Sequence, residues 1–283
     1  MSSRAALDIL AGAAYTPGES RNVTVRPFGE APTMKRTMVS KQKAKRRRPI
    51  GCAPQLIEDL VAANRILAAQ GVLDGFGHVS VRHDRDPGCY IMSRARAPEL
   101  VTTDDLMEYD FDSNPRDARG RSMYLERFIH GEIYKVRPDV NAIVHHHSPS
   151  VIPFGVTTVP LRPLYHVSAF LGDGAPVFEI RNAGGMTDML VRTPALGRAL
   201  AQSLGGKPAA LMRGHGAVVV GPSLPVTVGR SIYMAINATL QAQAMTLGNV
   251  TYLDLEEARL AGTHEALGFE RSWELWKRRA PTK

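Results

Sequence analysis

Cysteine is nearly absent from this sequence, which has two among 283 residues, Cys52 and Cys89. Two thiols at this spacing supply neither a disulfide framework nor a thiolate zinc site, and we interpret them as small apolar residues in a reducing compartment. Long apolar runs are also missing, because no stretch of about 18 uninterrupted apolar residues occurs and the N-terminus has no secretory-signal pattern. These absences predict a cytoplasmic globular protein with no membrane association.

An excess of basic residues is missing from most of the chain, although the formal net charge is +8. Residues 1–50 hold eleven basic and three acidic side chains, whereas the remaining 233 residues hold 24 of each sign. We therefore expect a disordered basic N-terminal tail over residues 1–50 and a single domain over residues 51–283. Because no base-stacking aromatics lie among the basic residues, we expect no nucleic-acid partner, with a nucleic-acid tether in the tail as the alternative.

Hydrophobic periodicity predicts an α/β chain in which antiparallel hairpins alternate with helices. The predicted helices cover residues 54–70, 124–135 and 224–248, with a short one near 148–155. The predicted strands cover residues 77–83, 88–94 and 140–147, and two more lie within 209–221 around a turn at 213–216. No linker interrupts this pattern.

The run "VHHHS" places three histidines at the end of a predicted strand. Side chains alternate between the faces of a strand, so His145 and His147 share one face and His146 lies on the other. His215 stands between two glycines at a turn, where backbone freedom allows its side chain to be aimed. His145, His147 and His215 are therefore candidate metal ligands, and the alternative for each is an ordinary core or surface histidine.

Glu126 lies at the start of the helix predicted to precede the histidine strand. A carboxylate in a first helical turn is stabilised by the helix dipole, which is the simplest reason for its position. Beside a metal, the same carboxylate acts as a ligand or as a catalytic acid or base. Spacing alone does not decide between these roles.

Three segments together resemble the class II aldolase and adducin family. They are "GHVSVR", "YLERFIHGEIYKVRPDVNAIVHHHSPS" and "RGHGAVVVG". The resemblance implies a three-layer α/β/α sandwich with a mostly antiparallel central sheet, and a homotetramer. It also implies one divalent metal ion on His145, His147 and His215, with Glu126 as the nearby acid or base; zinc or manganese is favoured, with iron or cobalt as alternatives.

The sequence departs from the sugar-phosphate members of this family where they hold the phosphate. Those places have His78, Arg94 with Ala95, and Tyr124 with Leu125 in place of small hydroxyl and amide donors. Guanidinium groups pair with carboxylates, and tyrosine and histidine contact aromatic rings, so the predicted partner is a small aromatic carboxylate. The predicted substrate-binding residues are Arg94, Arg96, His78 and Tyr124.

The segments "SRARAPELVT" and "HSPSVIPFGV" resemble a branch of decarboxylases that act on hydroxylated aromatic dicarboxylates, such as 3-hydroxy-2-methylpyridine-4,5-dicarboxylate and 3,4-dihydroxyphthalate. The resemblance predicts a carbon–carbon lyase, a metal-dependent decarboxylase in which the metal chelates a ring hydroxyl and the adjacent carboxylate. Two alternatives remain open. One is a class II aldolase that cleaves a non-phosphorylated hydroxy-acid aldol, and the other is a non-catalytic adducin-like binding module.

Overall fold

A computed structural model describes residues 50–280 of the chain. The predicted disordered tail, residues 1–50, lies outside the described residues except for its last residue, and the division into a tail and one domain stays a prediction. Within residues 50–280, no helix has both the length and the apolar character needed to cross a membrane.

The described residues contain eight α-helices and seven β-strands, together with four short 3-10 helices. In chain order the elements are α1 Pro54–Ala69, β1 His78–Arg82, β2 Cys89–Ser93, η1 Pro98–Leu100, η2 Thr103–Asp105, β3 Leu106–Asp110, η3 Leu125–Arg127, α2 Phe128–Val136, β4 Ala142–His146, α3 Ile152–Val156, η4 His166–Leu171, β5 Val177–Phe178, α4 Arg181–Gly184, α5 Pro194–Leu204, β6 Ala209–Met212, β7 Gly216–Gly221, α6 Leu224–Leu247, α7 Leu255–Gly262 and α8 Glu265–Arg279.

The seven strands form one sheet in the order β3-β2-β1-β4-β7-β6-β5. Every neighbouring pair is antiparallel except β5 and β6, which are parallel. The register pairs His78 of β1 with His145 of β4, and His146 of β4 with Ala217 of β7. His78 and His145, which are far apart in the sequence, therefore lie side by side at one end of the central strands.

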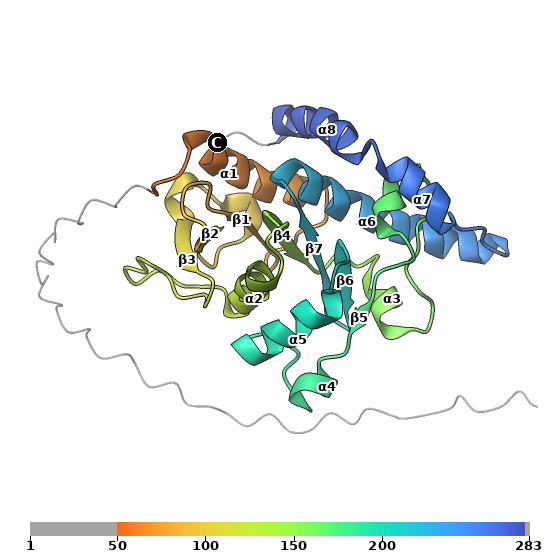
Figure 1. Ribbon diagram of the computed structural model, residues 1–283, viewed down its shortest axis with the longest axis horizontal. Helices are drawn as coiled ribbons and strands as arrows, with labels where there is room; N and C mark the ends of the chain where they lie inside the picture. The colour runs from red at the N-terminus through yellow and green to blue at the C-terminus, as the bar shows by residue number, and fades with distance from the viewer. Residues whose placement is uncertain (1–49, 281–283) are drawn as a thin grey trace, which may run out of the picture. The chain divides into compact units, whose positions relative to one another are not determined.

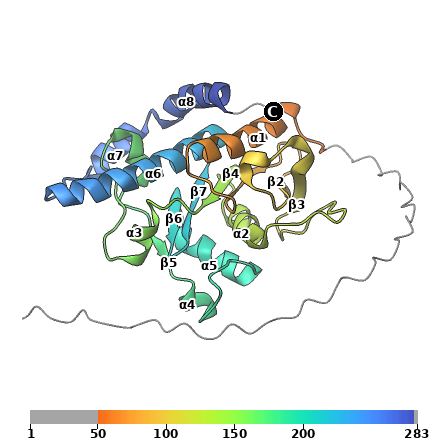
Figure 2. The same cartoon turned by 180° about the vertical axis from the view of Figure 1, so that it is seen from behind.

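Helices cover both faces of the sheet. Figures 1 and 2 show α1 and α6 on one side of the strands and α2 and α5 on the other. Alternation along β4 divides the core accordingly, because Val144 packs in the α1 and α6 layer whereas Ile143 packs in the α2 layer. The predicted three-layer α/β/α sandwich with a mostly antiparallel sheet is confirmed.

Helix α1 follows directly from its sequence. Pro54 occupies the first turn, where its missing N–H is not needed, and Leu60, Ala63 and Leu67 recur at helical spacing and are fully buried. The chain leaves the helix through Gly71, which has a φ of +69° that glycine adopts without strain. The prediction for this segment is confirmed.

The helix predicted over residues 124–135 needs a correction, because α2 begins at Phe128. The three preceding residues form the 3-10 turn η3, in which Glu126 has non-helical angles of φ −91° and ψ 17°. Glu126 thus stands before the helix and outside its first turn. Strands β3 and β5 and helices α4, α5, α7 and α8 were not predicted.

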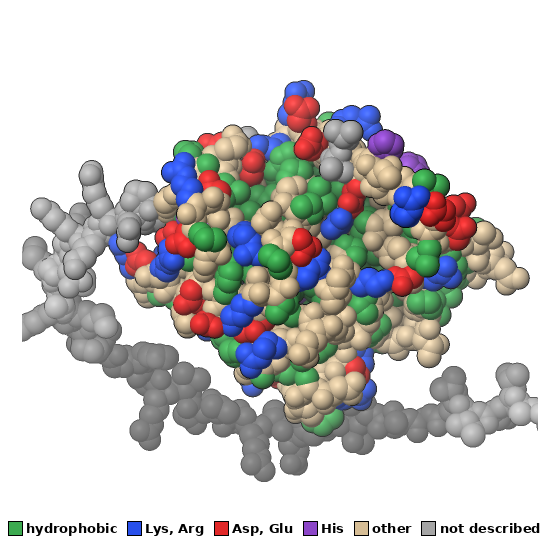
Figure 3. Space-filling view, viewed as in Figure 1, with side chains coloured by type: hydrophobic (Ala, Val, Ile, Leu, Met, Phe, Trp, Pro, Cys, Tyr) green, Lys and Arg blue, Asp and Glu red, His purple; other side chains and the backbone are tan. Residues whose placement is uncertain are grey.

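The described surface carries charges of both signs. Figure 3 shows acidic and basic side chains interspersed over the visible face, with apolar side chains between them. This mixture agrees with the equal numbers of acidic and basic residues after position 50.

Candidate active site

Three histidine side chains meet at one end of the sheet. His145 lies near the end of β4, His147 follows that strand directly, and His215 lies in the turn between β6 and β7. The Nε2 atoms of His145 and His147 are 3.0 Å apart, and those of His147 and His215 are 3.2 Å apart. The alternation that placed His145 and His147 together in the sequence thus brings their rings to one point with His215.

The opposite nitrogen of each ring faces an acceptor. His145 Nδ1 lies 3.1 Å from the carbonyl oxygen of Ala217, and His215 Nδ1 lies 3.0 Å from that of Met189. His147 Nδ1 lies 3.3 Å from both carboxylate oxygens of Asp74. A carbonyl or carboxylate oxygen only accepts, so each Nδ1 carries the proton and each Nε2 presents a lone pair.

This arrangement fits a bound cation. Lone pairs that face each other across about 3 Å repel, and three of them converge here with Glu126, as the ligand atoms of these four residues all lie within 4.8 Å of one another. Tetrahedral zinc with Zn–N bonds of about 2.0–2.1 Å would hold its nitrogen ligands roughly 3.3 Å apart, close to the separations observed. The residues present therefore suit a divalent metal.

Glu126 completes the group. Its Oε2 lies 3.5 Å from His145 Nε2 and 3.4 Å from His215 Nε2, while its Oε1 accepts a 2.9 Å hydrogen bond from the backbone N–H of Val191. Burial by itself raises the pKa of this carboxyl group, but the two histidines prevail and hold the pKa well below its ordinary value. The pKa of His215 moves in the opposite direction and is raised: burial disfavours the charged ring, but the Glu126 carboxylate outweighs burial.

The segment between α4 and α5 supports this group through its backbone. The side chain of Met189 is not part of this group, but its carbonyl oxygen accepts a hydrogen bond from His215 Nδ1. The φ of Met189 is +68°, a strained value for a residue with a side chain. Two residues later, Val191 supplies the N–H that holds Glu126. The strained turn thus orients both a candidate ligand and the candidate acid or base.

His146 lies on the other face, as predicted. Its ring is fully buried, its Nδ1 accepts a 3.3 Å hydrogen bond from the N–H of Ser148, and burial lowers its pKa to about 3. No recorded hydrogen bond or ring contact joins it to the Nε2 atoms of His145, His147 and His215. It is a core histidine.

Cys52, His83 and Asp84 form a second group of possible ligands within the described residues. His83 Nδ1 accepts backbone N–H groups from Arg85 and Asp86, so its lone pair is already used, and its Nε2 lies 3.4 Å from Glu108. Burial raises the pKa of the Cys52 thiol to about 11, so the thiol stays protonated at neutral pH. This group is structural.

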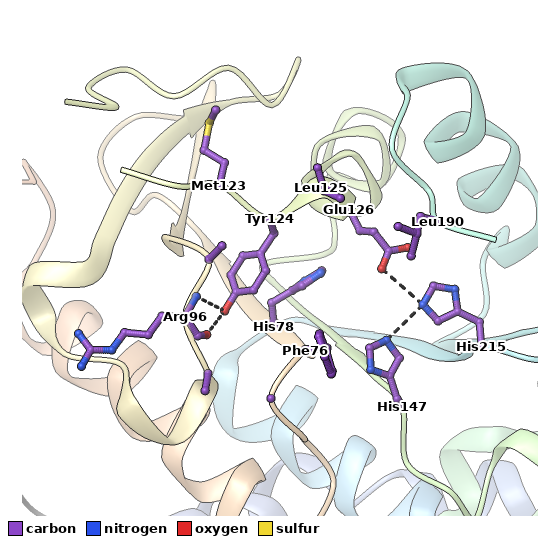
Figure 4. A pocket seen from close by; sticks show the side chains of 13 residues that line it. Phe76, His78, Arg96, Met123, Tyr124, Leu125, Glu126, His147, Leu190 and His215 are labelled. Atoms are coloured by element: carbon purple, nitrogen blue, oxygen red, sulfur yellow. Dashed lines mark hydrogen bonds and ion pairs between the residues drawn. The ribbon is translucent and has the colours of Figure 1, made fainter. Parts of the chain in front are cut away.

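A cavity of about 440 Å³ opens beside the three histidines. Its polar lining includes His78, Tyr124, Glu126, His147 and His215. Its apolar lining is formed by the side chains of Ala95, Ala97, Phe76, Met123, Leu125 and Leu190. Figure 4 shows the labelled side chains surrounding this space. The cavity has the size and the mixed lining of a site for a small ring-containing ligand.

Two of the predicted substrate-binding residues, His78 and Tyr124, contribute their rings to the lining of the cavity. The His78 ring packs between those of Tyr124 and His145, with centroids 4.6 and 5.0 Å away. The Tyr124 hydroxyl donates to the backbone carbonyl of Arg96. Both rings are therefore held in place at the cavity surface.

The predicted arginines are placed differently. Arg94 Nε lies 2.7 Å from the Asp105 carboxylate, and Arg96 Nη1 lies 3.0 and 3.1 Å from its two oxygens. Arg96 borders the cavity, but its guanidinium extends away from His147 and His215 in Figure 4, and Arg94 does not line the cavity. The structure thus joins both arginines to Asp105, and substrate binding by either stays a prediction.

Two further residues at the site were not predicted. Asp74 contacts His147, and it also accepts the N–H groups of Phe76 and Gly77 at 2.8 and 3.0 Å. Phe76 lines the cavity with 76% of its surface exposed. Asp74 lies in the Asp-Gly-Phe-Gly segment before β1, and only the fold shows that it reaches a histidine 73 residues away.

Comparisons with known proteins identify the family of this chain. The family model described as Class II Aldolase and Adducin N-terminal domain matches residues 58–242. The chain is 36% identical to the decarboxylase tropJ of Talaromyces stipitatus, with 80% of this chain and 94% of that protein covered. It is 29% identical to the 3,4-dihydroxyphthalate decarboxylase of Arthrobacter keyseri, with 78% and 90% covered.

A solved structure shows the shared fold. The L-fuculose 1-phosphate aldolase from Glaciozyma antarctica superposes with a TM-score of 0.65 and 23% identity, over 81% of this chain and 92% of that one. The fold, the matched domain and the similarity to tropJ over most of both chains agree. On this evidence, the chain belongs to the class II aldolase and adducin family.

Proposed function

We propose that this protein is a metal-dependent decarboxylase of a hydroxylated aromatic or heteroaromatic acid. The observation that carries the proposal is the convergence of three Nε2 lone pairs and a carboxylate at one end of a partly apolar cavity. The similarity to decarboxylases over most of the chain supports a carbon–carbon lyase that acts on an aromatic acid. A dicarboxylate is the specific substrate class that we put forward.

His145, His147 and His215 would hold the metal, which is zinc or manganese, with iron or cobalt as alternatives. When bound, the divalent cation supplies a Lewis acid for a ring hydroxyl and the neighbouring carboxylate of the substrate. Asp74 and the carbonyl groups of Ala217 and Met189 keep the three rings in the required tautomer.

Glu126 would act as the acid or base of the reaction. When carbon dioxide leaves, the electron pair of the broken bond stays on the ring carbon, and that carbon must take up one proton. Glu126 is fixed by Val191 on one oxygen and faces the cavity with the other. The carboxylate can accept the proton of the ring hydroxyl and later give it to the ring carbon, or orient a water that does so.

The remaining cavity residues would position the ring. His78 and Tyr124 present aromatic surfaces, and Phe76, Met123 and Leu190 would give the ring apolar contacts. Arg94 or Arg96 would orient a second carboxylate only if its guanidinium left Asp105. We also propose the homotetramer of the family, and the exposed Phe76 and Leu125 at the cavity suit contact with another subunit.

The test uses full-length protein loaded separately with zinc and manganese. We expect carbon dioxide release from 3,4-dihydroxyphthalate or a related ortho-hydroxy aromatic acid, and metal bound at one ion per chain. Cleavage of a hydroxy-acid aldol without any carbon dioxide release would establish the aldolase alternative. Purified protein that binds no stoichiometric metal would favour the non-catalytic binding module.

A further inference from the structure

The cavity has two chemically different ends. At the histidine end, the Nε2 atoms of His147 and His215 and the carboxylate of Glu126 face the candidate metal position. Figure 4 shows Met123 and Arg96 at the opposite end of the same cavity. We call this opposite end the remote end, and it is lined by Ala95, Arg96, Ala97 and Met123.

Two aromatic side chains lie between the ends and fix their order along the cavity. The ring of His145, a candidate ligand, packs against that of His78 with centroids 5.0 Å apart, and His78 packs against Tyr124 at 4.6 Å. The Tyr124 hydroxyl reaches the backbone of Arg96. A substrate ring that binds at the histidine end therefore directs its opposite edge toward the remote end.

Arg96 is the one charged residue among the described residues that line the remote end. Its guanidinium extends away from the histidine end in Figure 4. The Nη1 atom lies 3.1 and 3.0 Å from the two oxygens of Asp105, a buried carboxylate. A substrate carboxylate would have to displace Asp105 from this guanidinium, so the charge of Arg96 does not favour a second anion at the remote end.

The backbone at the remote end is also engaged within the protein. The N–H of Ala95 donates to the carbonyl of Ser122 at 2.9 Å, and the carbonyl of Ala97 accepts from the N–H of Leu100 at 2.9 Å. The side chains that these residues present to the cavity are methyl groups, and the side chain of Met123 beside them is apolar. A carboxylate in this place would lose its hydration without a partner that compensates the loss.

The cavity is larger than one aromatic ring requires. A protein cavity of roughly 150 Å³ holds a benzene ring, whereas this cavity measures about 440 Å³. Because alanine is small, positions 95 and 97 leave room at the remote end that longer side chains would fill. The remote end therefore suits a group that is attached to the ring and is apolar.

We propose that the substrate ring carries an uncharged hydrocarbon substituent on the edge opposite its chelating hydroxyl and carboxylate, and that Ala95, Ala97 and Met123 contact this substituent. The inference deepens the proposed function and rests on it for the orientation of the ring. Both carboxylates of a dicarboxylate substrate are then neighbours on the ring and face the histidine end. Ala95 and Ala97 determine specificity, because their small size sets the length of the substituent that fits.

The first test measures binding and needs no turnover. The probes are 2-hydroxybenzoate and its derivatives with an ethyl group or a carboxylate on either of the two ring carbons opposite the chelating pair. Calorimetric titration into zinc-loaded, full-length protein gives each Kd. We expect the better ethyl probe to bind about tenfold more tightly than 2-hydroxybenzoate, because each buried methylene strengthens binding about fourfold.

The carboxylate probes distinguish an apolar remote end from one that recognises anions. We expect both to bind at least about tenfold more weakly than 2-hydroxybenzoate, because the added charge is desolvated without a partner. A carboxylate probe that binds as tightly as 2-hydroxybenzoate, or more tightly, would overturn the inference. Ethyl probes that bind no more tightly than 2-hydroxybenzoate would overturn it as well.

The second test fills the remote end. Ala97→Leu should remove the preference for the ethyl probe while the Kd of 2-hydroxybenzoate changes by less than about threefold, because the histidine end is untouched. Ala95→Val is a second variant with a smaller change in volume. Ala242→Leu, at an exposed position of α6 outside the cavity, is the matched control and should keep the preference. A preference retained in both folded cavity variants would overturn the inference.

The two proposals fail in distinguishable ways. If no aromatic acid releases carbon dioxide but the ethyl probe binds more tightly, the proposed function fails and the recognition of the substituent stands. If carbon dioxide is released and the ethyl group does not strengthen binding, the reverse holds. No carbon dioxide release together with no binding of any probe would overturn both.

Discussion

Two groups of polar side chains near the cavity engage their polar atoms in different ways. In the histidine group, His145, His147 and His215 use their Nδ1 atoms for contacts with other residues and leave their Nε2 atoms facing each other. In the arginine group, Arg94 and Arg96 pair with Asp105. Lone pairs that face each other suit a ligand, whereas paired charges keep the loop in shape.

Residue type alone does not make this distinction. Arginines beside a cavity suggest carboxylate binding, and a cysteine, a histidine and an aspartate within reach suggest a metal site. In both places the lone pairs or donors are already engaged by the protein. Four experiments would break or sharpen the comparison between the histidine group and the arginine group.

The largest effect is expected from His147→Ala. Removal of one of three imidazole ligands should abolish stoichiometric metal binding and reduce kcat/KM by at least about 10³-fold, since the Lewis acid is lost. Metal content and carbon dioxide release measure the two effects. His83→Ala, in the second ligand group, should leave both unchanged; loss of metal in that variant would contradict the distinction.

Glu126→Gln should lower kcat by roughly 10²- to 10³-fold while the metal stays bound, because an amide cannot transfer the proton. The Gln side chain still accepts from Val191, so the local backbone should be preserved. Metal analysis of the same sample separates the two roles. A variant that loses its metal would show that Glu126 is chiefly a ligand.

Asp74→Asn should weaken metal affinity about tenfold, the lower end of the range for such supporting residues. The amide keeps one oxygen that can accept hydrogen bonds in the turn, but it no longer presents two charged oxygens to His147 Nδ1. Competition with a chelator measures the affinity. Asp86→Asn, on a turn away from the site, is the matched control, and equal affinities in both variants would remove Asp74 from the site.

Asp105→Asn should affect stability more than catalysis. Burial opposes ionisation of Asp105, but hydrogen bonds from Thr102, Arg94 and Arg96 lower its pKa from 3.8 to about 2. Because the folded-state pKa is the lower one, this stabilisation is complete above pH 3.8 and is lost as the pH falls toward 2. The substitution should cost about 2 kcal/mol at pH 7 and progressively less in acid.

Urea unfolding at pH 7 and pH 3 measures this difference, and KM should change by less than about threefold. A KM increase of tenfold or more with unchanged stability would instead place the arginines in the substrate site, as the sequence predicted. That result would make the arginine group and the histidine group parts of one binding surface.

Much of the fold was predictable because its central elements have strong periods. The alternation in β4 separated His146 from its neighbours, and Pro54 and Gly71 marked the ends of α1. The start of α2 was placed too early, because Leu125 continues the helical pattern of apolar residues although Glu126 must leave the helix to reach the histidines. Tertiary contacts outweighed local preference there.

The candidate metal ligands were easier to predict from the sequence than the residues that surround them. A resemblance of motifs pointed to His145, His147, His215 and Glu126, which the structure brings together. Asp74 lies 73 residues from His147, and no local pattern connects them. The pairing of Arg94 and Arg96 with Asp105 likewise depends on how η2 turns back toward β2, which spacing does not reveal.

Gly216 follows His215 at the point where β7 passes β4. A Cβ at this position would collide with the carbonyl oxygen of His146, so the two backbones touch without any side chain between them. The distance from β4 to the turn that carries His215 is therefore set by main-chain contact and cannot adjust by repacking. A metal bound by His145, His147 and His215 would meet a fixed spacing of its ligands, so we predict that replacing one divalent ion by another alters catalysis more than structure.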